Sequence, residues 1–322
     1  MPTYDDVVSA AEKISGLAVK TPLLKCEDLS EKLSAEIYIK AECLQRVGAF
    51  KFRGAYNRLC RLSDDEKKRG VVAFSSGNHA QGVAASAKIL GINATIVMPE
   101  DSPQMKLENT RNYGAEVVTY DRDKESREEL AAKIAEEKGS IVVPSFEDFY
   151  IISGQGTVGL EAIEQGSDID IDFDIFMTPV GGGGLISGCC LAVKKISPET
   201  EIYGVEPNEF NDVQRSIVNG KIEQNEKMSG SICDAILTPN PGEMTLELMS
   251  NNLAGVLTVS DEEVLRAMKY AWEKLKLVVE PGACVALAAI LHGKINVEGK
   301  KICLVLSGGN VDEENFIKAL SL

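Results

Sequence analysis

The sequence predicts an α/β protein with two open, twisted, mostly parallel sheets flanked by helices. Short apolar, β-branched segments alternate with stretches of helical periodicity along most of the 322 residues, which is the order of elements in a doubly wound fold. The apolar segments do not alternate with polar residues, so we expect strands buried on both faces, as in parallel sheets. A chain of this length exceeds the usual size of one domain and favours two.

The elements follow one another in a regular order. Apolar segments rich in β-branched residues are expected to form the strands Glu36–Lys40, Val71–Phe74, Ala94–Met98, Glu116–Thr119, Ser140–Val143, Phe173–Thr178, Glu201–Val205, Gly255–Val259 and Lys301–Leu306. Segments with helical periodicity are expected to form the helices Thr3–Ile14, Lys51–Cys60, Gly82–Leu90, Pro103–Tyr113, Glu125–Lys138, Gly156–Glu164, Gly184–Lys195, Asp261–Leu275, Ala283–Leu291 and Asp312–Leu320. Residues 219–242 are polar and rich in turn formers, so we expect a long loop there.

The strand pattern also suggests where the chain divides. We expect a large domain from residues 1–68 and 147–322, and a small domain from residues 69–146. In open parallel sheets, ligands bind outside the carboxyl ends of the strands. The loops that follow the strands are therefore where we expect the functional residues.

Composition excludes several classes of function. The net charge of −15 argues against nucleic acid or an anionic membrane surface as a partner. The N-terminus has no basic and apolar signal segment, and no apolar run could span a bilayer, so we expect a cytoplasmic protein. The eight cysteines are scattered without a C-x-x-C pair, which is typical of buried thiols in a reducing compartment. Only two histidines are present, which excludes multi-histidine metal sites.

Four consecutive glycines, Gly181–Gly184, lie between an expected strand and an expected helix. A glycine loop at a helix start directs free N–H groups at an anion, and the helix dipole assists. No G-x-x-x-x-G-K-[ST] sequence is present, which argues against a nucleoside triphosphatase. We therefore expect this loop to hold the phosphate of a small, singly phosphorylated cofactor.

A second glycine pattern, Gly154–Gly159, matches the G-x-G-x-x-G of dinucleotide-binding folds, with Asp172 and Asp174 about 20 residues further on. The expected strand before it ends well short of Gly154, with a proline and an acidic turn between them. We therefore interpret this pattern as a packing feature at a helix start.

Lys51 lies between Phe50 and Phe52 at the start of an expected helix. Apolar surroundings and a helix N-terminus both lower the pKa of a lysine. A neutral amine is what Schiff-base chemistry requires. The alternative interpretation is a surface lysine flanked by two core residues.

Five motifs then carry a resemblance. In chain order they are Gly48–Gly54 around Lys51, Ser75–His79, Gly181–Gly184, Glu280–Gly282 and Ser307–Asn310. This order is seen in pyridoxal-phosphate (PLP) enzymes of fold type II, the tryptophan-synthase-β type. Within that group the chain resembles the threonine/serine dehydratase and serine racemase family over nearly its whole length.

The resemblance implies a role for each matched residue. Lys51 would form the Schiff base with the cofactor aldehyde, and Ser76 would face the opposite side of the substrate Cα, so both would be catalytic. The implied cofactor-binding residues are Phe50, Lys51, Asn78, Gly181, Gly182, Gly183, Gly184, Leu185, Glu280 and Ser307. The implied substrate-binding residues are Ser75, Ser76, Gly77, His79 and Arg127.

The implied reaction is the elimination of water from threonine or serine, which gives a 2-oxo acid and ammonia. Serine racemisation and 3-hydroxyaspartate dehydration are the alternatives, and a homodimer is the implied assembly. Arg127 matches the position where racemases and some hydroxyaspartate dehydratases carry an arginine, and it could pair with a second substrate carboxylate. It could equally be a solvated arginine beside Glu128 and Glu129.

The resemblance also implies a divalent-cation site. Glu206, the carbonyl of Phe210 and Asp212 follow the expected strand Glu201–Val205 with the spacing of that site in the family. Two carboxylates and a carbonyl are hard oxygen ligands suited to magnesium or calcium. From spacing alone, these residues would be interpreted as an acidic loop.

Overall fold

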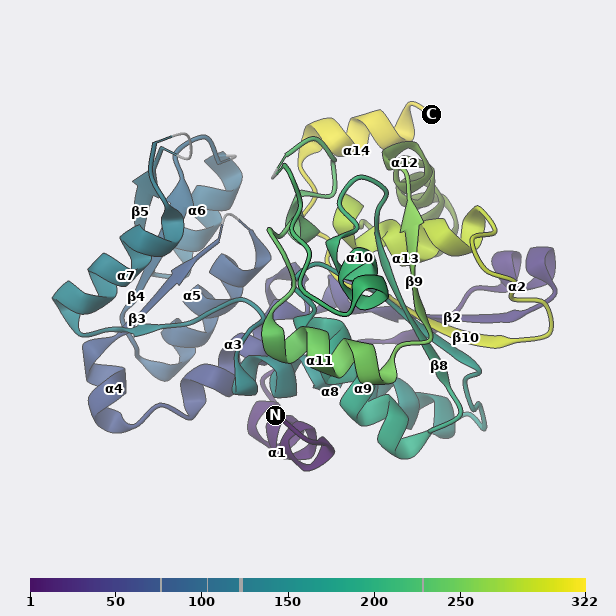
Figure 1. The fold of residues 1–322 in the computed structure, drawn as a ribbon, viewed down its shortest axis with the longest axis horizontal. Coiled ribbons are helices and arrows are strands. Elements are labelled where there is room, and N and C mark those ends of the chain that lie inside the picture. Colours follow the sequence, from purple (N-terminus) through teal and green to yellow (C-terminus); the bar gives the residue numbers. More distant parts are fainter. Residues whose placement is uncertain (76, 103, 122–123, 228) are drawn as a thin grey trace.

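The computed structural model describes residues 1–75, 77–102, 104–121, 124–227 and 229–322. It contains two mostly parallel sheets flanked by helices, which confirms the predicted fold class (Figure 1). The smaller sheet lies on the left of Figure 1 and the larger one on the right. The smaller sheet is built from residues within the range 71–142, whereas the domain boundaries predicted from the sequence remain predictions.

The larger sheet has six strands in the order β1-β2-β10-β7-β8-β9. Neighbouring strands are parallel except for the antiparallel pair β1–β2. The bounds are β1 Leu23–Lys25, β2 Glu36–Ala41, β7 Ile175–Pro179, β8 Glu201–Pro207, β9 Gly255–Val259 and β10 Lys301–Leu306. The central strands β10 and β7 are almost entirely buried, as expected for a sheet covered on both faces.

The smaller sheet has four parallel strands in the order β5-β4-β3-β6. Their bounds are β3 Val71–Phe74, β4 Ala94–Pro99, β5 Glu116–Tyr120 and β6 Ile141–Val142. In both sheets, loops that carry predicted motifs follow the carboxyl ends of parallel strands.

The α-helices complete the two layers around each sheet. Their bounds are α1 Tyr4–Ile14, α2 Glu27–Leu33, α3 Lys51–Cys60, α4 Asp64–Arg69, α5 Asn78–Leu90, α6 Gln104–Asn112, α7 Arg127–Lys138, α8 Phe149–Ser167, α9 Gly184–Ile196, α10 Asp212–Asn219, α11 Glu243–Asn252, α12 Asp261–Tyr270, α13 Pro281–Leu291 and α14 Glu313–Leu320. Short helical turns are η1 Glu42–Leu44, η2 Arg46–Gly48, η3 Asp234–Ile236 and the π-helical η4 Ala271–Leu275. None of the helices in the described ranges is long and apolar enough to cross a membrane.

Helix α8 starts earlier than the sequence pattern predicts. It begins at Phe149, capped by the Asp148 side chain, so the G-x-G-x-x-G pattern lies in the helix interior and not at its start. A Cβ on Gly154 would lie 2.7 Å from the Arg53 carbonyl oxygen, and one on Gly156 would lie 2.6 Å from the Gly188 carbonyl oxygen. These glycines let α3 and α9 pack closely against α8. The packing interpretation is therefore confirmed, but the expected position at a helix start was wrong.

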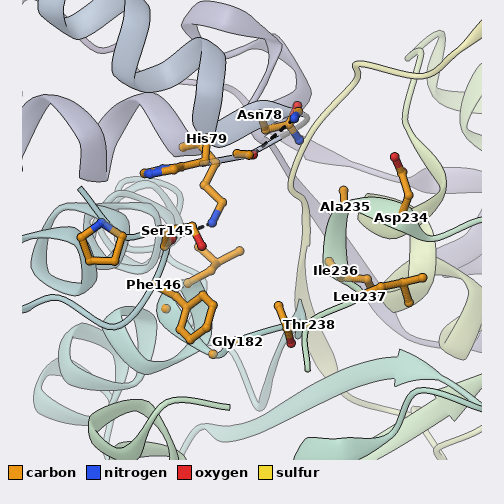
Figure 2. Close-up of a pocket in the computed structure, with 18 of the residues that line it drawn as sticks. Asn78, His79, Ser145, Phe146, Gly182, Asp234, Ala235, Ile236, Leu237 and Thr238 are labelled. Atoms are coloured by element: carbon orange, nitrogen blue, oxygen red, sulfur yellow. Dashed lines mark hydrogen bonds between the residues drawn. The ribbon is translucent and has the colours of Figure 1, made fainter. Parts of the chain in front are cut away.

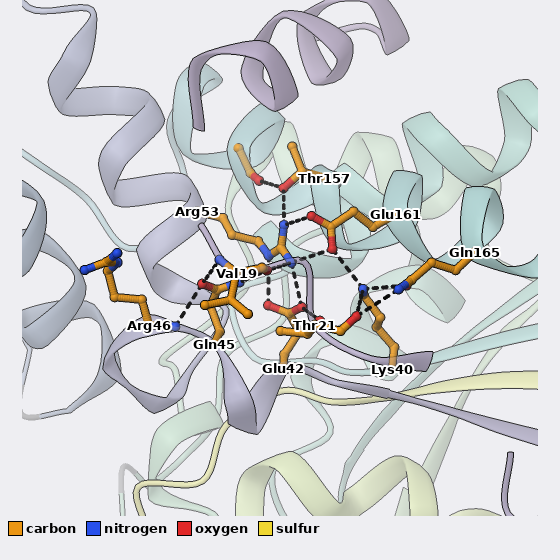
Figure 3. Close-up of polar contacts among 11 residues, drawn as sticks. Val19, Thr21, Lys40, Glu42, Gln45, Arg46, Arg53, Thr157, Glu161 and Gln165 are labelled. Atoms are coloured by element: carbon orange, nitrogen blue, oxygen red, sulfur yellow. Dashed lines mark hydrogen bonds and ion pairs between the residues drawn. The ribbon is translucent and has the colours of Figure 1, made fainter. Parts of the chain in front are cut away.

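A buried ionic network also fixes α3 in place (Figure 3). The Arg53 guanidinium donates to Glu42 at 2.8 Å and to Glu161 at 2.7 Å, and the Lys40 amine donates to Glu161 at 2.9 Å. Arg53, Glu42 and Lys40 are fully buried. Because Arg53 lies two residues after Lys51, this network holds the helical turn that presents the lysine.

Candidate active site

A cavity of about 360 Å³ lies between the two sheets. It is lined by every predicted cofactor-binding and substrate-binding residue that the structure describes, which are Phe50, Lys51, Ser75, Gly77, Asn78, His79, Arg127, Gly181, Gly182, Gly183, Gly184, Leu185, Glu280 and Ser307. Ser76, predicted as the second catalytic residue, lies outside the described residues. Five motifs that are distant in the sequence therefore meet in one place.

The sheets explain why these motifs converge. Ser75 follows β3, the glycine loop follows β7, and Ser307 follows β10, so each motif lies at the carboxyl end of a parallel strand. The segment before α3 is joined to the β10 loop, because the Phe50 N–H donates to the Ser307 carbonyl at 3.1 Å. This contact places Lys51 at the same edge of the larger sheet.

Lys51 is the first residue of α3 and lines the cavity. Its amine donates to the Ser145 carbonyl at 2.8 Å and lies 5.2 Å from the centroid of the Phe50 ring. Burial lowers the pKa of this amine from 10.5 to about 8, and the nearby Glu280 carboxyl opposes part of that shift. A substantial fraction of the amine is therefore neutral near physiological pH.

The glycine loop leaves no room for side chains. A Cβ would lie 2.8 Å from the Ile236 carbonyl oxygen at Gly181, and 2.3 Å from the Phe146 ring at Gly182. Gly183 has a φ of +92°, in the region that glycine adopts most readily, and Gly184 begins α9. The loop thus presents backbone to the cavity at the N-terminus of a 13-residue helix. This arrangement suits an anion such as a phosphate group.

A chain of polar contacts crosses the cavity beside Ser307. The Asn78 amide donates to the Glu280 carboxyl at 2.5 Å, and the Asn310 amide donates to the Asn78 side-chain oxygen at 2.8 Å (Figure 2 shows Asn78). Burial raises the pKa of Glu280 from 4.5 to about 7. These contacts fix the orientation of the Asn78 amide, which the resemblance places against the cofactor ring.

His79 is buried, and its ring is held by the residue that follows β6. Nε2 lies 2.9 Å from the Val143 carbonyl, so it carries the proton and donates. Burial, together with the neighbouring charge of Lys51, lowers the pKa of His79 from 6.5 to about 3. The neutral ring leaves Nδ1 as a hydrogen-bond acceptor, and this atom is buried without a partner among the described residues.

Two cations of the smaller sheet's helices also line the cavity. Arg127 begins α7, donates to Glu128 at 2.8 Å and stacks over the Phe74 ring at 5.6 Å. Lys106 of α6, which the sequence analysis missed, donates to Asp234 at 3.2 Å across the cavity. A single lysine in a polar helix has no sequence pattern that would identify it as a cavity residue. Further lining residues that were not predicted include Ser145, Phe146 and the segment Ala235–Asn240, and that segment lies within the expected loop of residues 219–242.

The predicted metal ligands lie apart from this cavity, at the end of β8. Glu206 and Asp212 are buried, and the Glu206 carboxylate accepts the Val213 and Gln214 N–H groups at 3.1 and 2.9 Å. Burial raises the pKa of Asp212 to about 6, and one of its carboxylate oxygens is buried without a hydrogen-bond partner among the described residues. No group of three or more His, Cys, Asp or Glu side chains in the described part of the chain could hold a metal ion.

Comparison with known proteins decides the family. The model of the pyridoxal-phosphate dependent enzymes matches residues 14–308. The chain belongs to this family. It is 44% identical over 321 residues to the L-threo-3-hydroxyaspartate ammonia-lyase of Saccharomyces cerevisiae, covering 100% of this chain and 97% of the relative. It is 41% identical over 312 residues to the L-threonine ammonia-lyase of Thermotoga maritima, covering 97% of this chain and 76% of the relative.

The solved structure of maize serine racemase has the same fold. It matches with a TM-score of 0.93 and 35% sequence identity, covering 99% of this chain and 97% of the racemase. The chain is therefore a PLP-dependent enzyme whose relatives are ammonia-lyases and amino-acid racemases, as the resemblance predicted. The glycine loop at the start of α9 and the lysine of lowered pKa fit such a cofactor.

Proposed function

We propose that this enzyme removes water from a β-hydroxy amino acid and releases a 2-oxo acid and ammonia. One observation carries the proposal: the Lys51 amine, with a pKa of about 8, shares a cavity with a glycine loop suited to a phosphate. The substrate class expected from the sequence is threonine or serine.

The cofactor would be held by residues that already line the cavity. The backbone N–H groups of Gly181–Leu185 would bind its phosphate, the Asn78 amide its ring hydroxyl, and the Ser307 hydroxyl its pyridine nitrogen. Phe50 would pack against the ring. When bound, PLP supplies an electron sink for the electrons of a bond broken at the substrate Cα.

Lys51 would act as the base of the reaction. A neutral amine can take the proton from Cα, and a pKa of about 8 lets the same group return to the neutral form at physiological pH. Loss of the Cα proton and the Cβ hydroxyl gives an enamine and water. The enamine tautomerises to an imine and is hydrolysed to ammonia and a 2-oxo acid. Backbone N–H groups near Ser75, Gly77 and His79 would hold the substrate carboxylate.

A β-hydroxy amino acid with a second carboxylate is the second candidate substrate. Arg127 lines the cavity with its side chain 35% exposed, so its guanidinium could also meet an anion from solution. A bidentate arginine–carboxylate pair would favour 3-hydroxyaspartate over threonine. The 44% identity to the yeast 3-hydroxyaspartate ammonia-lyase is in line with this candidate.

The test is a substrate panel for the purified enzyme with added PLP. Formation of 2-oxo acid from serine, threonine or 3-hydroxyaspartate supports the proposal, and its absence with all three would refute it. Arg127→Ala should lower kcat/KM for 3-hydroxyaspartate by about tenfold or more, since charged hydrogen bonds contribute about 1.5–3 kcal/mol. The same variant should change kcat/KM for threonine much less.

Serine racemisation is the alternative activity, and it depends on Ser76. Racemisation needs a group that returns a proton to the face of Cα opposite Lys51. Measuring the enantiomer ratio of serine in the same assays tests it. Ser76→Ala should abolish racemisation and spare elimination from one enantiomer, and unchanged racemisation would exclude Ser76 from that role.

We further propose a divalent cation, magnesium or calcium, at Glu206, the Phe210 carbonyl and Asp212. One carboxylate oxygen of Asp212 is buried without a hydrogen-bond partner in the part of the chain that the structure describes, which supports this site, because a cation would satisfy it. Addition of Mg²⁺ or Ca²⁺ to chelator-treated enzyme should raise Tm, and Asp212→Asn should lose that increase. A homodimer and a cytoplasmic location remain predictions, which light scattering and cell fractionation can check.

A further inference from the structure

Thr245 contacts the glycine loop but does not line the cavity. It lies in the first turn of α11 and is fully buried. Its hydroxyl donates to the Gly182 carbonyl at 2.7 Å and accepts the Gly242 N–H at 3.0 Å. A Cβ on Gly183 would lie 2.9 Å from Cβ of Thr245, so the loop lies directly against this side chain. No α11 residue lines the cavity, although Gly181–Gly184 all do.

The hydrogen bond to Gly182 fixes the direction of an N–H group. The carbonyl of one residue and the N–H of the next point in opposite directions across a planar trans peptide. With the Gly182 carbonyl held toward α11, the Gly183 N–H is directed away from α11. A carbonyl without this partner could rotate and carry the N–H with it.

Thr245 is itself held at both ends of its backbone. Its N–H and that of Met244 donate to the Glu147 carboxylate at 3.4 and 2.7 Å, and its carbonyl accepts the Ser187 hydroxyl at 3.2 Å. Ser187 lies in the first turn of α9, the helix that follows the glycine loop. The start of α11 is thus joined to the loop, to the helix after it, and to the segment that leads from the smaller sheet into α8.

We propose that Thr245 is a positioning residue that aims the glycine-loop N–H groups at the cofactor phosphate. The proposal rests on the function proposed above, because it assumes that this loop holds the phosphate. It assigns a role to α11, which has no part in the cavity lining. Pre-set donors bind an anion more tightly than donors that must first be oriented.

The test compares two ligands that differ only in the phosphate. The full-length enzyme, freed of cofactor by dialysis against a carbonyl reagent, is titrated with PLP and with pyridoxal, and binding is followed by absorbance. Thr245→Val keeps the shape of the side chain and removes the hydroxyl. It should weaken PLP binding by about tenfold, in line with one hydrogen bond to a charged group, and change pyridoxal binding by less than about twofold.

Two control variants separate this role from a general loss of stability. Thr245→Ser restores the hydroxyl and should restore most of the PLP affinity. Thr200→Val removes the hydroxyl of another buried threonine, which donates to the Phe173 carbonyl at 2.7 Å outside the cavity. It should leave the ratio of PLP to pyridoxal affinity unchanged.

If Thr245→Val lowers the affinities for PLP and pyridoxal equally, or lowers neither affinity, the proposal is overturned. If that variant does not fold, Ser187→Ala takes its place. It should weaken PLP binding more than pyridoxal binding, and an equal effect on both would again contradict the role of Thr245. A wild-type enzyme that forms no reducible link between PLP and Lys51 would instead refute the proposed function, so the two failures are distinguishable.

Discussion

Substituting alanine at Gly182 tests how tightly the phosphate loop is packed. Gly182 is not among the glycines with positive φ, so its backbone accepts alanine. The added methyl group would lie 2.3–2.4 Å from three atoms of the Phe146 ring, where carbon atoms normally stay about 3.5 Å apart. The ring or the loop must therefore move by about 1 Å, and such overpacking typically costs about 1–3 kcal/mol.

The overpacking in Gly182→Ala should lower both the stability of the fold and the affinity for the cofactor. Gly182→Ala should lower Tm by a few degrees and weaken PLP binding by about tenfold, measured by thermal unfolding and by absorbance titration. Phe146→Ala removes the colliding ring, so adding Gly182→Ala to that variant should have little further effect. Gly255→Ala is the matched control, because its methyl would meet the nearest atom at 3.4 Å, an ordinary contact. Equal effects of Gly182→Ala with and without the Phe146 ring would refute this reasoning.

Two further predictions concern the buried charges. Arg53→Met leaves the carboxylates of Glu42 and Glu161 without their buried partner, and should lower the free energy of unfolding by about 3–5 kcal/mol in urea titrations. Arg266→Met breaks the exposed ion pair with Glu262 and should lower the free energy of unfolding by less than about 1 kcal/mol. Similar losses of stability in the Arg53 and Arg266 variants would contradict this expectation. Glu280→Gln removes a carboxyl whose pKa is raised from 4.5 to about 7 by burial. In the wild type this carboxyl binds a proton more tightly in the folded state than in the unfolded chain. The wild type therefore loses stability as pH rises from 4.5 to 7. The Tm of Glu280→Gln relative to wild type should therefore rise between pH 4.5 and 7 and then level off, whereas a difference independent of pH would exclude this titration.

The sequence predicts the parallel strands and the cavity well because local patterns determine both. The nine predicted strands are all present, with ends shifted by at most two residues. The glycine loop and the Ser307 motif follow parallel strands of the larger sheet and therefore lie at one edge of it, and the Asn78 motif follows β3 of the smaller sheet on the other side of the cavity. Strand β1 was missed, since three residues on a sheet edge carry too little pattern.

Tertiary contacts determine what the sequence did not predict. The first seven residues of α8 contain an aromatic pair and small residues, with no helical periodicity, and the helix starts there because Asp148 caps it and α3 packs on it. The role of Phe146 depends on Gly182, 36 positions away, and that of Thr245 on a carbonyl 63 positions away. No local pattern marks a residue whose partner lies on another element.

The most direct test of the account is the site of cofactor attachment. The purified enzyme is incubated with PLP, reduced with borohydride, digested and analysed by mass spectrometry. We expect loss of the visible absorbance band and a phosphopyridoxyl group on Lys51, with neither the band nor the label in Lys51→Ala. Labelling of a different lysine, or an absorbance band that persists in Lys51→Ala, would contradict the assignment of this cavity as the PLP site.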